Sequence, residues 1–254
     1  RNASIAPLGI TPFIKTNPET STQDSITNIT TSEASLLIQY AHHEKYVSGE
    51  FDRVSLGTKH PTLTVFYTYG VPNVFNSEYE YHKLVFGYKH KFSLGIIGTT
   101  KYQFSVGKVW GKLPYPLLEV HPGNETWGYN EDAYNLMNIN EFVSDEYISF
   151  NVHQHFGGIL LNKIPLLRKL KWREVVTFKG IYGRLQQKNT NLMALADYTT
   201  TLTAKPYMEL AAGIENIFSF LRVDAVWRLS YLSHEVDGIK VSPFGIRGKL
   251  QFEF

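Results

Sequence analysis

Apolar and polar residues alternate along much of this chain. The stretch FGIRGKLQFEF (244–254) has apolar or small residues at its even positions and polar, charged or glycine residues at its odd positions. The same period of two recurs in YHKLVFGYKHKFSLG (81–95), EYISFNVHQHF (146–156), YMELAAGIE (207–215) and LRVDAVWRLSYL (221–232). Alternation of this length predicts β-strands rather than amphipathic helices.

We expect about ten strands, at roughly 33–43, 49–57, 61–70, 79–94, 98–110, 143–156, 170–184, 204–215, 220–232 and 243–254. Residues 1–32 are polar and predict a linker or loop before a single β-domain over residues 33–254. The stretch IPLLRKL (164–170) predicts one short helix.

The predicted connections differ in length. They are tight near 94–98 and 216–218 but long and polar at 111–142, 185–203 and 233–242. Short turns at one end and long loops at the other are typical of outer-membrane barrels, and tilted strands of about 9–11 residues suffice to cross the bilayer. We therefore predict an all-β fold, a transmembrane antiparallel outer-membrane β-barrel, either complete or the C-terminal part of a larger barrel.

The placement of charge agrees with this prediction. A charge facing lipid at the midplane costs about 2–4 kcal/mol, so the charged alternate positions are expected to face the lumen. This lumen charge network comprises Glu209, Glu215, Arg222, Asp224, Arg228, Arg247, Lys249 and Glu253. It is either a salt-bridge network that fills the barrel or the lining of an ion-selective pore. A soluble antiparallel sheet with one solvated face would alternate in the same way.

Composition narrows the function classes. The chain has 254 residues, a net charge of +2 and no cysteine, and its charged residues make up 19%. Basic residues are interspersed with acidic ones, so no nucleic-acid partner is expected. Thiolate metal sites are excluded, no apolar run is long enough for a transmembrane helix, and no motif predicts a cofactor, a metal site or catalytic residues.

Two further groups of residues are candidates for function. His153 and His155 lie two apart on the predicted lumen face, either as a hydrogen-bonded polar pair or as a catalytic or metal pair. A basic cluster surrounds the predicted helix and is assigned to a periplasmic turn, where it would bind anionic headgroups, dock a partner or simply be solvated. Its members are Lys163, Arg168, Lys169, Lys171 and Arg173.

The C-terminal residues Leu250, Phe252 and Phe254 resemble the signal that bacterial barrel-assembly machinery recognises on a last strand. That resemblance implies a periplasmic C-terminus, extracellular long loops, and pairing of the last strand with the first so that no edge is left in lipid.

Three longer stretches carry a family resemblance: LPYPLLEVHPGNETW (113–127), FGGILLNKIPLLRKLKWREVVTFKGIYG (156–183) and PYMELAAGIENIFSFLRVDAVWRLSYL (206–232). Over about residues 33–254 the chain resembles the C-terminal barrel of a Bacteroidota outer-membrane family of unknown function. Members of that family typically carry an N-terminal carboxypeptidase-regulatory-like β-sandwich, which this sequence lacks. The resemblance implies no catalytic residues.

From these observations we expect a non-enzymatic outer-membrane protein, a subunit of an assembly, export or uptake complex. Its expected partners are outer-membrane lipid, the barrel-assembly machinery and other outer-membrane proteins. A passive or gated pore for small solutes and a barrel enzyme that acts on lipid are the alternatives.

Overall fold

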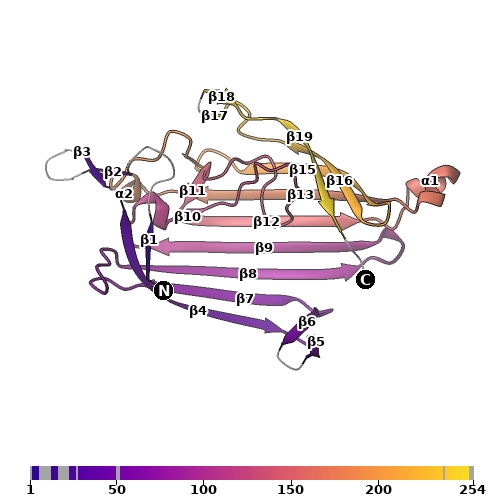
Figure 1. The fold of residues 1–254 in the computed structure, drawn as a ribbon, viewed down its shortest axis with the longest axis horizontal. Coiled ribbons are helices and arrows are strands. Elements are labelled where there is room, and N and C mark those ends of the chain that lie inside the picture. Colours follow the sequence, from indigo (N-terminus) through magenta and orange to yellow (C-terminus); the bar gives the residue numbers. More distant parts are fainter. Residues whose placement is uncertain are drawn as a thin grey trace.

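Ten strands form one large antiparallel sheet. The computed structural model describes residues 2–5, 13–16, 23–26, 28–49, 52–236 and 238–251. The strands of the large sheet, in their order across it, are β1 (Asn2–Ile5), β4 (Ile29–Ala41), β7 (Thr62–Gly70), β8 (Tyr81–Ser93), β9 (Thr99–Trp110), β12 (Glu146–His155), β13 (Arg173–Arg184), β15 (Tyr207–Ile217), β16 (Leu221–Arg228) and β19 (Phe244–Leu250) (Figure 1). Strands that are consecutive in this order along the chain are also neighbours in the sheet, so the sheet is a simple meander.

The remaining elements are short. The smaller strands are β2 (Phe13–Thr16), β3 (Gln23–Ile26), β5 (Lys45–Ser48), β6 (Arg53–Gly57), β10 (Glu119–Val120), β11 (Phe142–Ser144), β14 (Thr200–Thr201), β17 (Glu235–Val236) and β18 (Ile239–Lys240). The helical turns are η1 (Gly95–Ile97), η2 (Tyr115–Leu117), η3 (Leu161–Lys163), α1 (Pro165–Leu170) and α2 (Gln187–Thr190).

The expectation of an all-β fold with a large antiparallel sheet is confirmed, with two differences in detail. The strand expected at 49–57 is instead part of the hairpin β5–β6, because the backbone turns at Gly49, whose N–H donates to the carbonyl of Asp52 at 2.7 Å. Residues 1–32, expected as a linker or loop, contain β1, β2, β3 and the beginning of β4, and β1 pairs with β4 in the large sheet.

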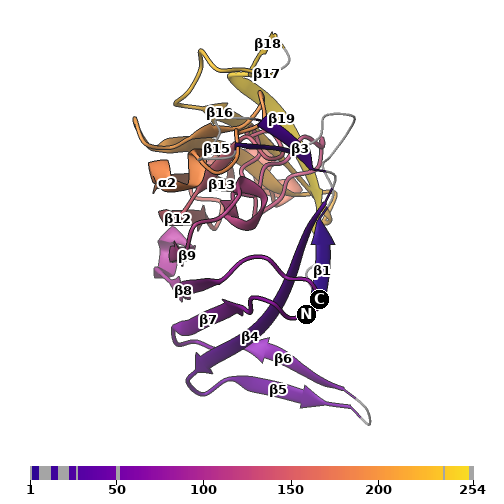
Figure 2. The same ribbon diagram turned by 90° about the vertical axis from the view of Figure 1, so that its left-hand side faces the viewer.

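Seen from one end, the sheet curves around residues 111–142 (Figure 2). We call the face that this segment covers the inner face and the opposite face the outer face, and we call residues 111–142 the insert. The strand register assigns residues to the faces, because residues that pair across strands share a face. The row Gln103–Asn151–Lys179–Glu209–Arg228, for example, runs along the inner face from β9 to β16.

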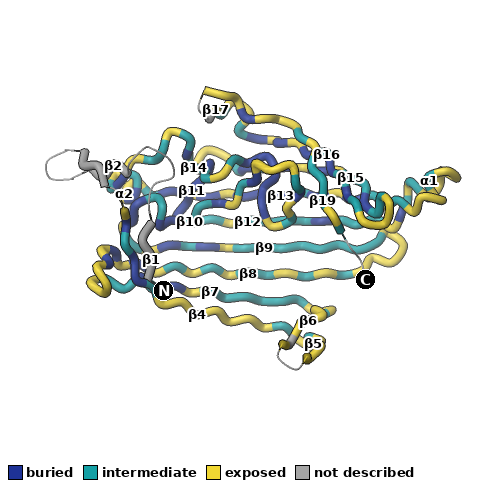
Figure 3. Tube along the Cα trace, in the orientation of Figure 1, coloured by how far each residue is buried: buried dark blue, intermediate teal, exposed yellow. Residues whose placement is uncertain are grey.

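The hydrophobic core lies between the inner face and the insert. Met137 and Phe142 of the insert region are fully buried against Ile181 and Tyr207 of the sheet. Buried residues therefore concentrate in β11, β13 and the insert, whereas β4 and α1 are largely exposed (Figure 3). The insert was expected as a long polar loop, but it supplies much of the core.

The outer face carries exposed apolar side chains. Each of the following is more than a third exposed: Leu84, Phe86, Val106, Ile148, Val176, Leu210, Trp227, Phe244 and Ile246. None of the helices in the described part of the chain has the length and apolar character that crossing a membrane requires.

A closed barrel is not found among the described residues, because β1 and β19 lie at opposite ends of the strand order. The insert occupies part of the β19 edge that was expected to pair with the first strand. Gly248 donates its N–H to the carbonyl of Trp127 at 3.0 Å and accepts from the N–H of Tyr129 at 2.7 Å. Edge pairing by the insert satisfies backbone groups that would otherwise be open to another strand.

If the insert is part of the core, Met137→Ala will lower the free energy of unfolding by about 2–5 kcal/mol, because a fully buried side chain leaves a cavity. Urea titration followed by tryptophan fluorescence measures this change. The control Ile139→Ala removes a side chain of the same segment that is 53% exposed, and it should change the free energy by less than about 0.5 kcal/mol. Equal, small effects of both variants would show that the insert is not packed against the sheet.

Candidate functional site

The charged residues assigned to the lumen lie on the inner face. Glu209, Glu215, Arg222, Asp224 and Arg228 are all buried there. Arg247 and Lys249 of β19 pair with Asp224 and Arg222 across the strands and are half-buried. Glu253 lies outside the described residues. The inner face therefore carries a dense network of polar side chains, most of which are buried.

Arg228 forms an ion pair with Glu141 of the insert, and both side chains are fully buried. Its Nη1 and Nη2 lie 3.0 and 2.6 Å from the two carboxylate oxygens of Glu141. Glu209, which faces Arg228 across the strands, accepts hydrogen bonds from the backbone N–H groups of Asn135 and Leu136 at 2.8 and 2.7 Å. Burying charges is costly unless they are paired and hydrogen-bonded, and here the insert supplies the partners.

A second ion pair lies closer to the other end of the same strands. Arg222 donates from Nε and Nη2 to the carboxylate of Asp224 at 2.7 and 2.8 Å, and its guanidinium lies 4.5 Å from the ring centroid of Tyr129. Gly213 leaves the space for this pair, since a Cβ there would lie 2.5 Å from the Asp224 carboxylate. Tyr129 is itself buried against the arginine.

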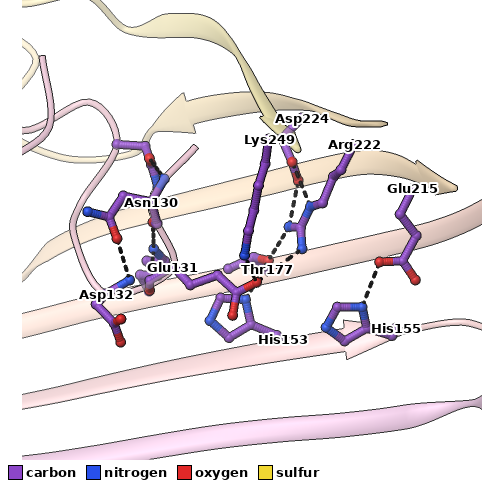
Figure 4. A network of polar contacts seen from close by, with 12 residues as sticks. Asn130, Glu131, Asp132, His153, His155, Thr177, Glu215, Arg222, Asp224 and Lys249 are labelled. Atoms are coloured by element: carbon purple, nitrogen blue, oxygen red, sulfur yellow. Dashed lines mark hydrogen bonds and ion pairs between the residues drawn. The ribbon is translucent and has the colours of Figure 1, made fainter. Parts of the chain in front are cut away.

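Glu131 links the insert to the neighbouring strands β16 and β19. Its carboxylate accepts a hydrogen bond from Lys249 at 2.6 Å and lies 4.0 Å from Nη1 of Arg222 (Figure 4). Burial opposes ionisation of this carboxyl, but the hydrogen bond and charge of Lys249, with the charge of Lys101, hold its pKa at about 2. Glu131 therefore remains a carboxylate across the physiological pH range.

Both candidate histidines are hydrogen-bonded within the network (Figure 4). Nδ1 of His155 lies 2.9 Å from Glu215, and Nδ1 of His153 lies 3.0 Å from Oγ1 of Thr177. No group of three or more metal-ligating side chains occurs in the part of the chain that the structure describes. Both rings are thus hydrogen-bonded, His153 to a hydroxyl group and His155 to a carboxylate.

Lys179 is a central residue that the sequence analysis missed. Its Nζ donates to the backbone carbonyls of Asn130, Glu131 and Ala133 at 2.8, 2.9 and 2.6 Å. The available signal was the alternation in REVVTFKGIYGR (173–184), which places Lys179 on the face of the strand opposite to Val176 and Phe178. The three acceptors lie in the insert, so no pattern within the strand could have identified them.

The basic cluster lies apart from the network, on and around α1, which projects from one end of the sheet (Figure 1). Its Lys163, Arg168, Lys169, Lys171 and Arg173 are all exposed. Apolar neighbours are exposed with them, including Leu166 at 71% and Ile164 at 49%. Leu250 of the terminal signal is exposed on the outer face, and Phe252 and Phe254 lie outside the described residues.

Breaking the Arg228–Glu141 pair should be strongly destabilising. Glu141→Gln leaves the buried guanidinium without its counter-charge, and we expect a loss of about 3–5 kcal/mol in the free energy of unfolding. The control Glu146→Gln removes the same charge from a partly exposed site, where Glu146 pairs with Lys108 and Arg184, and should cost less than about 1 kcal/mol. Similar losses in urea titrations of the two variants would contradict the special role of the buried pair.

Comparison with known families gives one result. A model described as the C-terminal domain of a family of unknown function (DUF5686) matches residues 9–188. The match includes the insert and α1 and ends before β15, so the stretch 206–232 lies beyond it. A comparison with curated proteins found no match.

Proposed function

The chain belongs to the DUF5686 C-terminal domain family, whose function is unknown, and we propose that its sheet is embedded in an outer membrane as a barrel filled by the insert. The single observation that carries this proposal is the distribution of residues along the outer face. Three adjacent strands place charged residues at one end of that face and apolar residues next to them.

At one end of this face, Lys108, Glu146 and Arg184 form an ion-paired row across β9, β12 and β13. Below it lie Val106, Ile148 and Tyr182, and then further apolar residues down to Thr100, Gln154 and Val176. From Glu146 to Gln154 the strand rises about 26 Å at ~3.3 Å per residue, before any tilt is counted. Outer-membrane barrels have an apolar band about 25 Å tall between polar rims.

The ends of this band also carry aromatic residues. The rings of Tyr69 and His82 stack at 4.8 Å next to Trp110, which pairs with His82 across β8 and β9. Towards the opposite end, Tyr88 and Tyr102 stack at 5.6 Å. Aromatic side chains at both interfaces are a property of membrane barrels.

Within the outer membrane we propose a non-enzymatic role as a subunit of an assembly, export or uptake complex. The insert fills the interior with buried ion pairs, so a passive solute pathway would require this segment to leave its site. The surfaces that remain for partners are the basic α1 turn and the hairpin β5–β6, both exposed beyond one end of the sheet. That end also carries the short turns and would face the periplasm.

Other parts of the proposal come from the family resemblance. They are a Bacteroidota source, an N-terminal carboxypeptidase-regulatory-like domain in the full-length protein, and folding by the barrel-assembly machinery. The histidine contacts favour no lipid-modifying reaction.

Because the chain has no cysteine, single-cysteine variants can map its lipid-facing surface without background. In reconstituted vesicles, Ile148→Cys and Leu210→Cys on the outer face should resist a water-soluble maleimide at least tenfold more than Lys188→Cys, whose site is exposed in α2. All variants should react at similar rates after denaturation. Fast labelling of the two outer-face cysteines in folded protein would rule out embedding in lipid.

The complex can be tested separately. Purification of the native protein from outer membranes in mild detergent, with mass measurement of the particle, should give a stoichiometric multi-protein complex. A charge-reversed α1 turn (Arg168→Glu/Lys169→Glu) should reduce recovery of the partners if the turn docks them, whereas Lys240→Glu at the opposite end should not. Recovery of a lone barrel from native membranes would contradict a role as a subunit.

A further inference from the structure

A cavity of about 330 Å³ opens on the inner face between β7, β8 and β9. Its lysines come from the sheet: Lys89 and Lys91 from β8 and Lys101 from β9. The tip of the insert, with Glu131 and Asp132, forms part of its wall, and Thr58 and Thr62 contribute hydroxyl groups. Cavities that bind small ligands have volumes of about 300–1,000 Å³, so this one is large enough for a small molecule or a headgroup.

The arrangement of the lysines is unfavourable without a ligand. Lys91 and Lys101 are directly paired across β8 and β9 on the same face, where like charges destabilise a sheet. Lys89 lies two residues along the same strand and therefore shares that face. Neither Lys91 nor Lys101 has a carboxylate within 4.0 Å among the described residues, so the protein itself does not form ion pairs with this pair of charges.

The two nearby carboxylates are already engaged or distant. Glu131 accepts a hydrogen bond from Lys249 at 2.6 Å, so Lys101 shares the charge of this carboxylate with Lys249. Asp132 lies 3.9 Å from Lys89, and both side chains of that pair are mostly exposed. An exposed pair at this separation contributes little, so the cavity retains an excess of positive charge.

A second cavity, of about 560 Å³, extends the basic surface. It shares Gly57, Thr58, His60 and Lys91 with the first. It adds Lys45 and Lys59, and no carboxylate is among its described lining residues. Its lining includes Ser93 and Thr99, which lie at the end of the sheet that carries the short turn 94–98.

We propose that this pair of cavities binds a phosphate-bearing ligand, with its phosphate group between Lys91 and Lys101. A phosphate monoester carries a charge between about −1.5 and −2 at neutral pH and has three acceptor oxygens, which match the two ammonium groups that are paired across β8 and β9. A single carboxylate would neutralise one lysine and leave the other. Lys89 and Thr62 lie in the same cavity and offer further donors to the remaining oxygens.

The phosphate can belong to a soluble compound or to a lipid headgroup. The chemistry recognised is the same, and the experiment separates the two sources. The proposal does not depend on whether the sheet spans a membrane, because the cavities lie on the inner face.

The test is titration calorimetry of the full chain in neutral detergent with pyrophosphate, at pH 8 and low ionic strength. We expect saturable binding at one site, and the double variant K91Q/K101Q should weaken it at least tenfold. The matched control K188Q/K240Q removes two exposed lysines at the opposite end of the sheet and should change the affinity less than twofold. Equal weakening by both variants, or no saturable binding to the wild type, would overturn the proposal.

Folding and ligand class are checked independently. Without ligand, the thermal midpoint of K91Q should equal or exceed that of the wild type, because this variant removes the repulsive pair and keeps Lys101 near Glu131; a lower midpoint would contradict the repulsion. Pyrophosphate should raise the midpoint of the wild type but not of K91Q/K101Q. Malonate, a dicarboxylate, should bind the wild type at least tenfold more weakly; equal affinity would overturn the assignment of phosphate.

To separate the sources, nanodiscs that contain phosphatidic acid are compared with phosphatidylcholine nanodiscs. If phosphatidic acid at the cavity is the ligand, it will reduce pyrophosphate affinity in the wild type. Unchanged affinity in the two discs assigns the site to a soluble phosphate compound.

Discussion

The buried charges of the inner face constrain the rest of this structure. Arg228 is buried away from the surface, and its guanidinium is paired with a carboxylate that lies 87 residues earlier in the chain. The same requirement holds for Glu209 and Lys179, whose partners are backbone groups of the insert. A buried ion is tolerated only with its partners in place, so the sheet and the insert must fold as one unit.

This dependence explains why the insert is not a surface loop. It supplies a carboxylate to Arg228, carbonyl groups to Lys179 and apolar side chains to the core, and it pairs with the edge of β19 at Gly248. Removing it would leave several charges buried without partners and a strand edge open. In the proposed membrane setting, the same segment makes the interior a filled structure, and transport would have to use either a moving insert or a partner.

The alternating pattern predicted the strands of the sheet because a half-buried strand has a period of two that a single sequence displays. It also placed Glu209, Arg222 and Asp224 on the same face. The packing of residues 111–142 against the sheet was not predictable, because their contacts are with residues far away in the sequence and follow no period. The pairing of Glu141 with Arg228 is of this kind. Barrel closure was expected from the residues of the last strand alone. Trp127 and Tyr129 of the insert pair with the edge of that strand, and the residues of the strand give no indication of this pairing.

The inner face of the sheet is polar and buried and the outer face is apolar and exposed, and the proposed membrane location rests on the outer face. Trp227 lies on that face, paired with Phe244 across β16 and β19 and 37% exposed. The most direct measurement is fluorescence quenching of a variant that retains only this tryptophan, in vesicles whose lipids carry bromine along their acyl chains. The account predicts strong quenching by the brominated chains and little by aqueous iodide. Quenching by iodide alone would place the outer face in water and contradict the account.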